Sequence, residues 1–253
     1  MRKHHLKKQL KRLGLLAYAL VFLFFLNTNV TGQEGAGNIA FGVKVGVASS
    51  TLSNSYQNML YSENKVGFAG GGFVSYQILD FLGASAEVLY VQEGASHTNP
   101  SFFYYPEALW RGETAKENTN LTMHNIEIPV MLNLYIPGFT GDIEPRFYVG
   151  GSFDIITKSI AKDQIYISAS DGFLPEREIE DVSESIEWNN IGLIIGTGFN
   201  FNGGDIGMTL DVRYKIGMNN ISNLATLNHV GYYGYTDAFS TNCLMVLVGI
   251  SLP

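Results

Sequence analysis

The sequence predicts an all-β fold, an eight-stranded antiparallel up-and-down barrel, from three observations. Eight segments alternate apolar and other residues with the period of two that is typical of β-strands. The connections between these segments alternate strictly between long and short. The composition favours strands and turns, with 28 glycines, 16 Phe and 14 Tyr in a chain of 253 residues.

A leader sequence precedes the eight segments. Six Lys and Arg within residues 2–12 are followed by the apolar run 13–26, which would be about 21 Å long as a helix and too short for the roughly 30 Å hydrocarbon core. This order is typical of a secretory signal peptide. Val30 and Gly32 stand three and one positions before the expected cut. We therefore expect residues 1–32 to be a cleaved signal peptide and residues 33–253 to be an outer-membrane β-barrel domain.

The charge of the mature chain excludes one class of partner. Cleavage would remove six of the 16 Lys and Arg and none of the 23 Asp and Glu, which leaves a formal charge of −13. A chain this acidic is not expected to bind nucleic acid. The single cysteine, Cys243, can form no internal disulfide. It also lies far in the sequence from the expected cut, so it is not placed to carry a lipid anchor there.

The eight segments are 39–48, 65–78, 82–91, 125–135, 146–156, 188–200, 208–217 and 243–252.

The first four of these segments each have one apolar face. In the first, the odd residues are apolar and Lys44 lies on the other face. In the second, the even residues are apolar, interrupted by two glycines. The third and fourth have apolar even residues and place Glu87 and Glu127 opposite them.

The last four segments follow the same rule. The fifth has mainly apolar odd residues, with Arg146 and Asp154 on the other face. The sixth opposes apolar odd residues to a face with three glycines. The seventh, MTLDVRYKIG, sets five apolar residues against Asp211, Arg213 and Lys215. The eighth is apolar at every even position.

The connections decide which face is inside. The long ones are 49–64, 92–124, 157–187 and 217–242, and the short ones are 79–81, 136–145 and 201–205. An up-and-down membrane barrel has both termini and the short turns at one end and the long loops at the other. A soluble sandwich or lipocalin gives no reason for this alternation. We therefore expect transmembrane strands with apolar faces against lipid and charged faces in the lumen.

The lumen is predicted to be polar and filled with side chains. A barrel of eight strands is just wide enough for side chains to fill, and inward glycines leave room for long ones. Four cations and four anions face inward and would form a structural polar network. They are Lys44, Glu87, Glu127, Arg146, Asp154, Asp211, Arg213 and Lys215.

An acid/base or metal site built from the four carboxylates is the alternative. We favour the structural interpretation, because the matched cations would hold the carboxylates ionised and a filled lumen admits no substrate. His97, His124 and His229 lack metal-ligand spacing, and no nucleophile-elbow, zinc-hydrolase or nucleotide-binding motif occurs. The sequence thus predicts no enzyme, with no catalytic, cofactor-binding or metal-binding residue.

Two long connections concentrate aromatic residues. They could form a binding surface, or they could pack on one another or on the membrane interface. The candidate binding residues are Phe102, Phe103, Tyr104, Tyr105, Trp110, Tyr232, Tyr233 and Tyr235. The acidic stretch 175–187 is explained adequately as a solvated loop or strand extension.

Four phrases carry a family resemblance. AFGVKVGVASS at 40–50, NIEIPVMLNLY at 125–135, EPRFYVGGSFD at 144–154 and DVRYKIGMNNIS at 211–222 resemble the PorT-like outer-membrane β-barrel family of Bacteroidetes-type bacteria. The resemblance implies a small barrel in the outer membrane of a Gram-negative bacterium. The namesake members take part in protein secretion linked to gliding motility, and the family offers no catalytic residues to transfer.

These observations support competing functions. The first is a non-enzymatic structural or accessory component of the envelope, in either a secretion assembly or another envelope assembly, with outer-membrane lipid and other envelope or secretion proteins as partners. The second is a surface receptor or adhesin that uses the aromatic loops. An outer-membrane enzyme and a narrow pore rank lower, since no catalytic constellation occurs and eight strands leave little space.

Overall fold

The computed structural model describes residues 39–54, 62–100, 115–136, 143–167, 179–184, 186–203, 206–222 and 239–252. All of them lie in one compact unit, Gly35–Pro253. The predicted signal peptide lies outside the described residues. No helix among the described residues is both long enough and apolar enough to cross a membrane.

The described residues form nine strands. They are β1 (Ile39–Asn54), β2 (Ser62–Leu79), β3 (Leu82–Pro100), β4 (Ala115–Tyr135), β5 (Ile143–Ile167), β6 (Ile179–Asp181), β7 (Asn189–Gly203), β8 (Ile206–Gly217) and β9 (Phe239–Leu252). Eight of them contain the eight predicted segments, apart from Trp188, which precedes β7. The ninth, β6, is a three-residue strand that pairs only with β5.

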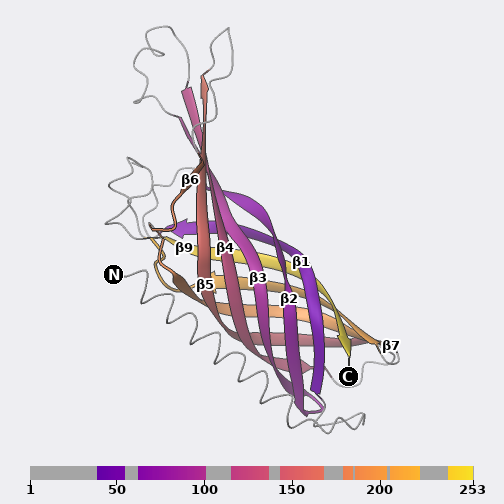
Figure 1. Ribbon diagram of the computed structural model, residues 1–253. Helices are drawn as coiled ribbons and strands as arrows, with labels where there is room; N and C mark the ends of the chain where they lie inside the picture. The colour runs from indigo at the N-terminus through magenta and orange to yellow at the C-terminus, as the bar shows by residue number, and fades with distance from the viewer. Residues whose placement is uncertain are drawn as a thin grey trace. The chain divides into compact units, whose positions relative to one another are not determined.

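The eight long strands close into a barrel (Figure 1). Strands adjacent in the sequence pair antiparallel, with β5 followed by β7 around the wall. The first and last strands also pair, with Phe41 opposite Leu252, so the wall has no open edge at this seam. The predicted closed, all-β, eight-stranded antiparallel barrel is confirmed.

The faces of the strands are inverted relative to a soluble protein. Along β8 the charged residues Arg213 and Lys215 are 1% and 0% exposed, whereas Tyr214 between them is 39% exposed. Large apolar side chains cover the outside of the other strands as well, and Val43 and Val130 are each more than half exposed. This apolar outer surface is what a barrel surrounded by lipid requires.

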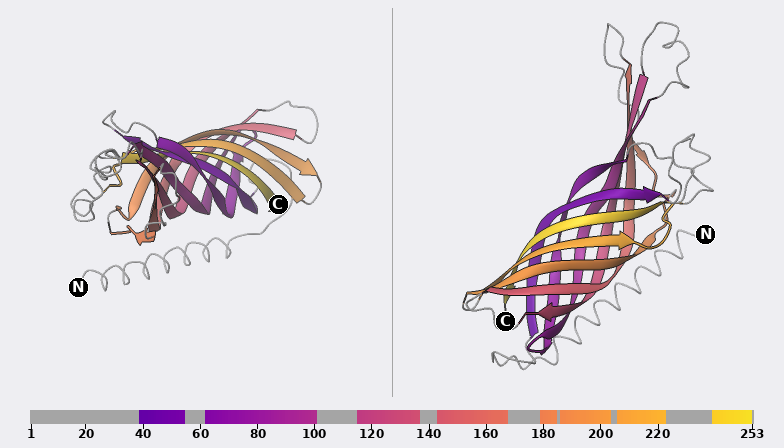
Figure 2. Two further views of the ribbon diagram at one scale, coloured as in Figure 1. Left: turned by 90° about the horizontal axis from the view of Figure 1, so that it is seen from above. Right: turned by 180° about the vertical axis from the view of Figure 1, so that it is seen from behind.

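Three strands, β3, β4 and β5, extend furthest beyond the segments that the sequence pattern predicts. The predicted segments end at residue 91 in β3, begin at 125 in β4 and end at 156 in β5. The structure continues their pairing, so that β4 and β5 remain in register as far as Ala115 opposite Ile167. Figures 1 and 2 show β3, β4 and β5 rising beyond the other strands on the long-loop side. The added residues are more polar, because a strand beyond the lipid layer no longer needs an apolar outer face.

Candidate functional site

The lumen holds two groups of ion pairs at different heights. The turn-side cluster, nearer the short connections, contains Lys44, Glu87, Arg146, Asp211 and Arg213. The loop-side cluster, nearer the long connections, contains Glu93, Glu127, Asp154 and Lys215. Every one of these side chains is at most 5% exposed. The strand alternation that places apolar residues outside thus brings the charged residues together inside.

Lys44 joins the two carboxylates of the turn-side cluster. Its Nζ lies 2.7 Å from Oε1 of Glu87 and 2.7 Å from Oδ2 of Asp211. The same ammonium lies 4.4 Å from the centre of the Phe73 ring, close enough for a cation–π contact. Residues of β1, β2, β3 and β8 therefore meet at this point, and the contact ties four strands across the lumen.

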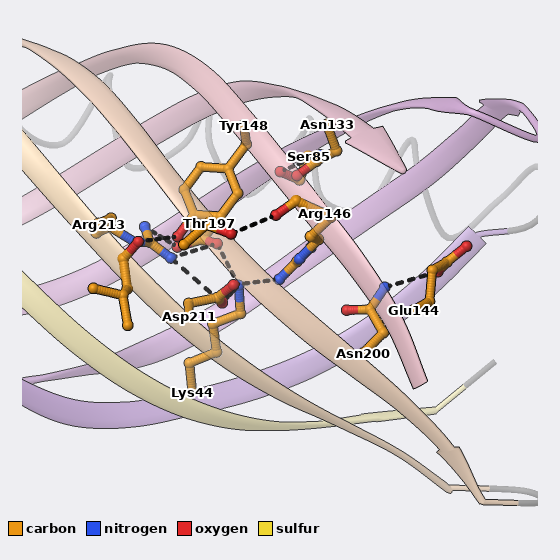
Figure 3. Close-up of polar contacts among 12 residues, drawn as sticks. Lys44, Ser85, Asn133, Glu144, Arg146, Tyr148, Thr197, Asn200, Asp211 and Arg213 are labelled. Carbon is orange, nitrogen blue, oxygen red and sulfur yellow. Dashed lines mark hydrogen bonds and ion pairs between the residues drawn. The ribbon is translucent and has the colours of Figure 1, made fainter. Parts of the chain in front are cut away.

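Two arginines complete the turn-side cluster (Figure 3). Arg213 donates from Nη1 and Nη2 to the two oxygens of Glu87, at 2.8 and 3.1 Å. Arg146 donates from Nη2 to Oδ1 of Asp211 at 2.6 Å. The ring of Tyr148 lies near both guanidinium groups, with its centre 5.6 Å from that of Arg146 and 5.7 Å from that of Arg213. Charge-assisted pairs of this kind stabilise buried charges that would otherwise be costly.

The loop-side cluster is built around Lys215. Its Nζ lies 2.6 Å from Oε1 of Glu93, 2.9 Å from Oε2 of Glu127 and 2.8 Å from Oδ2 of Asp154. Two amides add donors, Asn125 Nδ2 to Glu93 Oε2 at 2.8 Å and Asn190 Nδ2 to Asp154 Oδ2 at 3.1 Å. One cation therefore serves three carboxyl groups.

The expected balance of four cations and four anions is wrong, because Glu93 is a fifth buried carboxyl. The third predicted segment ends at Val91, but β3 continues and Glu93 has the same inward phase as Glu87. Extending the period of two by one more step would have found it. The buried charged residues among those described are thus four cations and five acids.

Inward glycines provide the space that the long side chains occupy. A Cβ placed on Gly196 would lie 2.4 Å from Cε2 of Tyr148, and one on Gly192 would lie 2.9 Å from Cγ of Lys215. Both distances are shorter than side-chain contacts allow. The glycines of β7 therefore shape the lumen for the aromatic and cationic residues on the neighbouring strands.

The lumen is not polar throughout. An apolar cluster, which we call the loop-end seal, closes its long-loop end. Its members are Leu52, Ala95, Leu121, Met123, Ala161, Val182, Ile186, Ile221 and Phe239. Backbone hydrogen bonds hold it, from Glu187 N to Ile221 O at 2.8 Å and from Ile221 N to Phe239 O at 2.9 Å. Two smaller apolar clusters lie alongside the ion pairs. Inward residues of the strands thus pack as hydrophobic layers above and beside the charges.

The described residues offer no group suited to metal binding. No cluster of three or more His, Cys, Asp or Glu among them has the geometry to hold a metal ion. Nδ1 of His124 lies 2.6 Å from Oη of Tyr90 in an exposed contact. In the acidic stretch, hydrogen bonds from the Ser183 hydroxyl and backbone to the exposed Asp181 hold the pKa of that carboxyl below its usual value. This part of the stretch is a short strand followed by a turn, in which Asp181 and Glu184 are exposed while Val182 and Ile186 are buried.

The aromatic candidates of the loops fall outside the described residues. They are Phe102, Phe103, Tyr104, Tyr105, Trp110, Tyr232, Tyr233 and Tyr235. His229 and the side chain of His97 also fall outside them. The residues that sequence analysis missed are Glu93 and the amides Asn125 and Asn190, which hydrogen-bond the loop-side carboxyl groups.

Several solved structures match this chain at low sequence identity. Neisserial surface protein A is 13% identical, with 84% of this chain and 97% of that chain covered and a TM-score of 0.42. The outer membrane protein OprG from Pseudomonas aeruginosa is 11% identical, with 87% and 98% covered and a TM-score of 0.46. Ail, the attachment invasion locus protein of Yersinia pestis, is 10% identical, with 86% and 99% covered and a TM-score of 0.37.

Comparison with protein families identifies the family of this chain. No curated protein matches the chain significantly. The family described as "Outer membrane protein beta-barrel domain" matches residues 29–223, which is well over half of the chain. The matched range begins before β1 and ends after β8, so it takes in all but one strand of the barrel. The chain belongs to the outer membrane protein beta-barrel domain family.

Proposed function

We propose that the protein is a non-enzymatic structural or accessory component of the outer membrane, working with other envelope proteins rather than as a pore or a catalyst. The observation that carries this proposal is the filled lumen. Two ionic clusters and the loop-end seal occupy the interior, and each luminal cation is engaged by at least one carboxylate. An interior committed to its own side chains has no space for a substrate.

We further propose that its partners include a secretion assembly of a Bacteroidetes-type envelope. This narrower proposal rests on the resemblance of the strand phrases to the PorT-like family. The apolar outer wall supports lipid as the immediate environment, and the part of the barrel available to a soluble partner is its two ends.

A receptor or adhesin role is the second candidate, and one observation favours it. β3, β4 and β5 project past the barrel, and the aromatic-rich segment 101–114 joins the projecting ends of β3 and β4. Paired strands that project from a barrel are a rigid base from which a loop could bind a ligand.

A complementation experiment separates the two functions. A strain lacking the gene is tested for sensitivity to detergent and to large antibiotics, and it is complemented with the wild-type protein or with a variant in which Phe102, Phe103, Tyr104 and Tyr105 are changed to Ala. An envelope component predicts a sensitive strain that both proteins rescue. Rescue by the wild type alone, with equal amounts of both proteins in the membrane, would favour the receptor. No change in sensitivity on deletion would contradict the envelope role.

Co-purification identifies the partner class. The barrel is extracted in mild detergent from native membranes, and the proteins retained with it are compared with those retained by an unrelated outer-membrane barrel of similar size. Retention of envelope or secretion proteins in stoichiometric amounts is expected. A barrel that is extracted alone under several mild detergents would contradict the accessory role.

A further inference from the structure

The loop-side cluster has too few cations for its carboxyl groups. Among the described residues, Lys215 is the single cation beside Glu93, Glu127 and Asp154, so the cluster would carry a charge of −2 if all three acids were ionised. The turn-side cluster has three cations and two acids, a charge of +1. The buried residues of the described lumen would then sum to −1. An uncompensated charge in a dry interior is strongly disfavoured.

Two of the three carboxyl groups are forced together by the sheet. Glu127 on β4 and Asp154 on β5 are direct cross-strand partners, and both side chains point into the lumen. Directly opposed residues have Cβ atoms about 4.5 to 5.5 Å apart, and like charges at such positions repel. Water would weaken this repulsion, but neither side chain is exposed to water.

Two oxygens of these acids have neither a hydrogen-bond donor nor an ion-pair contact among the described residues. The Lys215 ammonium donates to Oε2 of Glu127 and to Oδ2 of Asp154, and it forms an ion pair with Oε1 of Glu93, which has no hydrogen-bond donor but lies 2.6 Å from the ammonium. Asn125 adds a donor to Glu93, and Asn190 adds one to Asp154. Among the described residues, no donor reaches Oε1 of Glu127 or Oδ1 of Asp154. These two oxygens belong to the two residues that face each other across β4 and β5.

The other neighbours of the pair within the described part of the chain cannot supply the missing charge. Glu93 on β3 is itself an acid, and on β9 the residue opposite Lys215 is Cys243. From β7 the neighbour is Asn190, which is neutral. The loop-end seal covers the cluster on the side of the long connections with apolar residues of β1, β3, β4, β5 and β9.

We propose that the lumen binds one proton, held between Oε1 of Glu127 and Oδ1 of Asp154. One carboxyl group donates this proton to the oxygen of the other, which gives both atoms a hydrogen-bond partner. The proton comes from water as the barrel folds, and it brings the four cations and five acids to electrical balance. Because folding then takes up a proton, the stability of the barrel falls as the pH rises.

Infrared difference spectroscopy tests the proposal on the full chain refolded in detergent micelles at about pH 7, where ordinary carboxyl groups are ionised. The wild type should show the C=O absorption of a protonated carboxyl group, shifted in D₂O. Glu127→Gln and Asp154→Asn should each abolish it, because one acid then remains in the pair. Glu144→Gln changes a partly exposed carboxyl outside the two clusters and should leave the absorption intact.

A second measurement covers the case in which the luminal variants fail to fold. The urea midpoint of the wild type should fall as the pH rises from about 5 to about 9, a range above the usual titration of exposed carboxyl groups, and the carboxyl absorption should disappear over the same interval. The proposal is overturned by a wild type without the absorption at neutral pH, or by an absorption that persists in Glu127→Gln and Asp154→Asn.

Discussion

Arg213 is the residue of the turn-side cluster whose loss should be most informative. Replacing it with methionine keeps a long side chain but removes the guanidinium that donates to both oxygens of Glu87 at 2.8 and 3.1 Å. Of the cations that the structure describes, Glu87 would then keep only Lys44, whose Nζ lies 2.7 Å away and is shared with Asp211. In the variant, the buried carboxylate of Glu87 therefore shares one cation, Lys44, with a second carboxylate.

The expected cost follows from this partial compensation. Removing one partner of a buried ion pair typically destabilises a protein by about 3 to 5 kcal/mol. Because Lys44 remains in contact with Glu87, we expect Arg213→Met to lie near the lower end, at about 3 kcal/mol. This corresponds to a change of roughly two orders of magnitude in the unfolding equilibrium constant.

The assay is urea unfolding of the refolded barrel in lipid vesicles, followed by the difference in gel mobility between unheated and heated samples. Val212→Leu is the matched control on the adjacent lipid-facing position and should change stability by less than about 0.5 kcal/mol. A double-mutant cycle with Glu87→Gln should show strong coupling. A loss below about 1 kcal/mol for Arg213→Met, as for an exposed pair, would refute the buried network as described.

Three further outcomes are expected. Val212→Arg places a charge on the lipid side and should cost about 2 to 4 kcal/mol in the same assay, and an unchanged midpoint would contradict the lipid assignment. Gly46→Ala should destabilise the barrel by about 1 to 3 kcal/mol or more, since the new Cβ would lie 2.0 Å from the Val246 carbonyl oxygen. Gly72→Ala should be tolerated, because the nearest atom to its Cβ would be 3.6 Å away. Equal effects of the two substitutions would contradict the packing. Planar-bilayer recordings of the pure protein should show little or no sustained conductance, and a stable large channel would contradict the filled lumen.

The faces of the strands could be predicted from the sequence because lipid imposes a strict rule on them. An outward residue must be apolar over the thickness of the membrane. Once the connections indicate a barrel, a strand with apolar residues on one face and charges on the other, as around Val212, must therefore place its charged face in the lumen. The same rule explains why the order and number of strands could be read correctly.

Beyond the membrane no such constraint acts on the strand pattern. β4 begins at Ala115 rather than 125, because its first ten residues pair with β5 without any apolar outer face to reveal them. Glu93 was missed for the same reason, and with it the excess of acids in the loop-side cluster. The grouping of charges into two clusters depends on register and height in the barrel, which periodicity does not determine.

Site-directed labelling tests the inverted barrel most directly. In a Cys243→Ala background, single cysteines are introduced as Val212→Cys and Tyr214→Cys on the outer face and as Thr209→Cys and Arg213→Cys on the inner face of β8. We predict that a lipid-soluble thiol reagent in the bilayer labels the first two and leaves the last two unreacted. Labelling of positions 209 and 213 from the lipid, with protection of 212 and 214, would contradict the account.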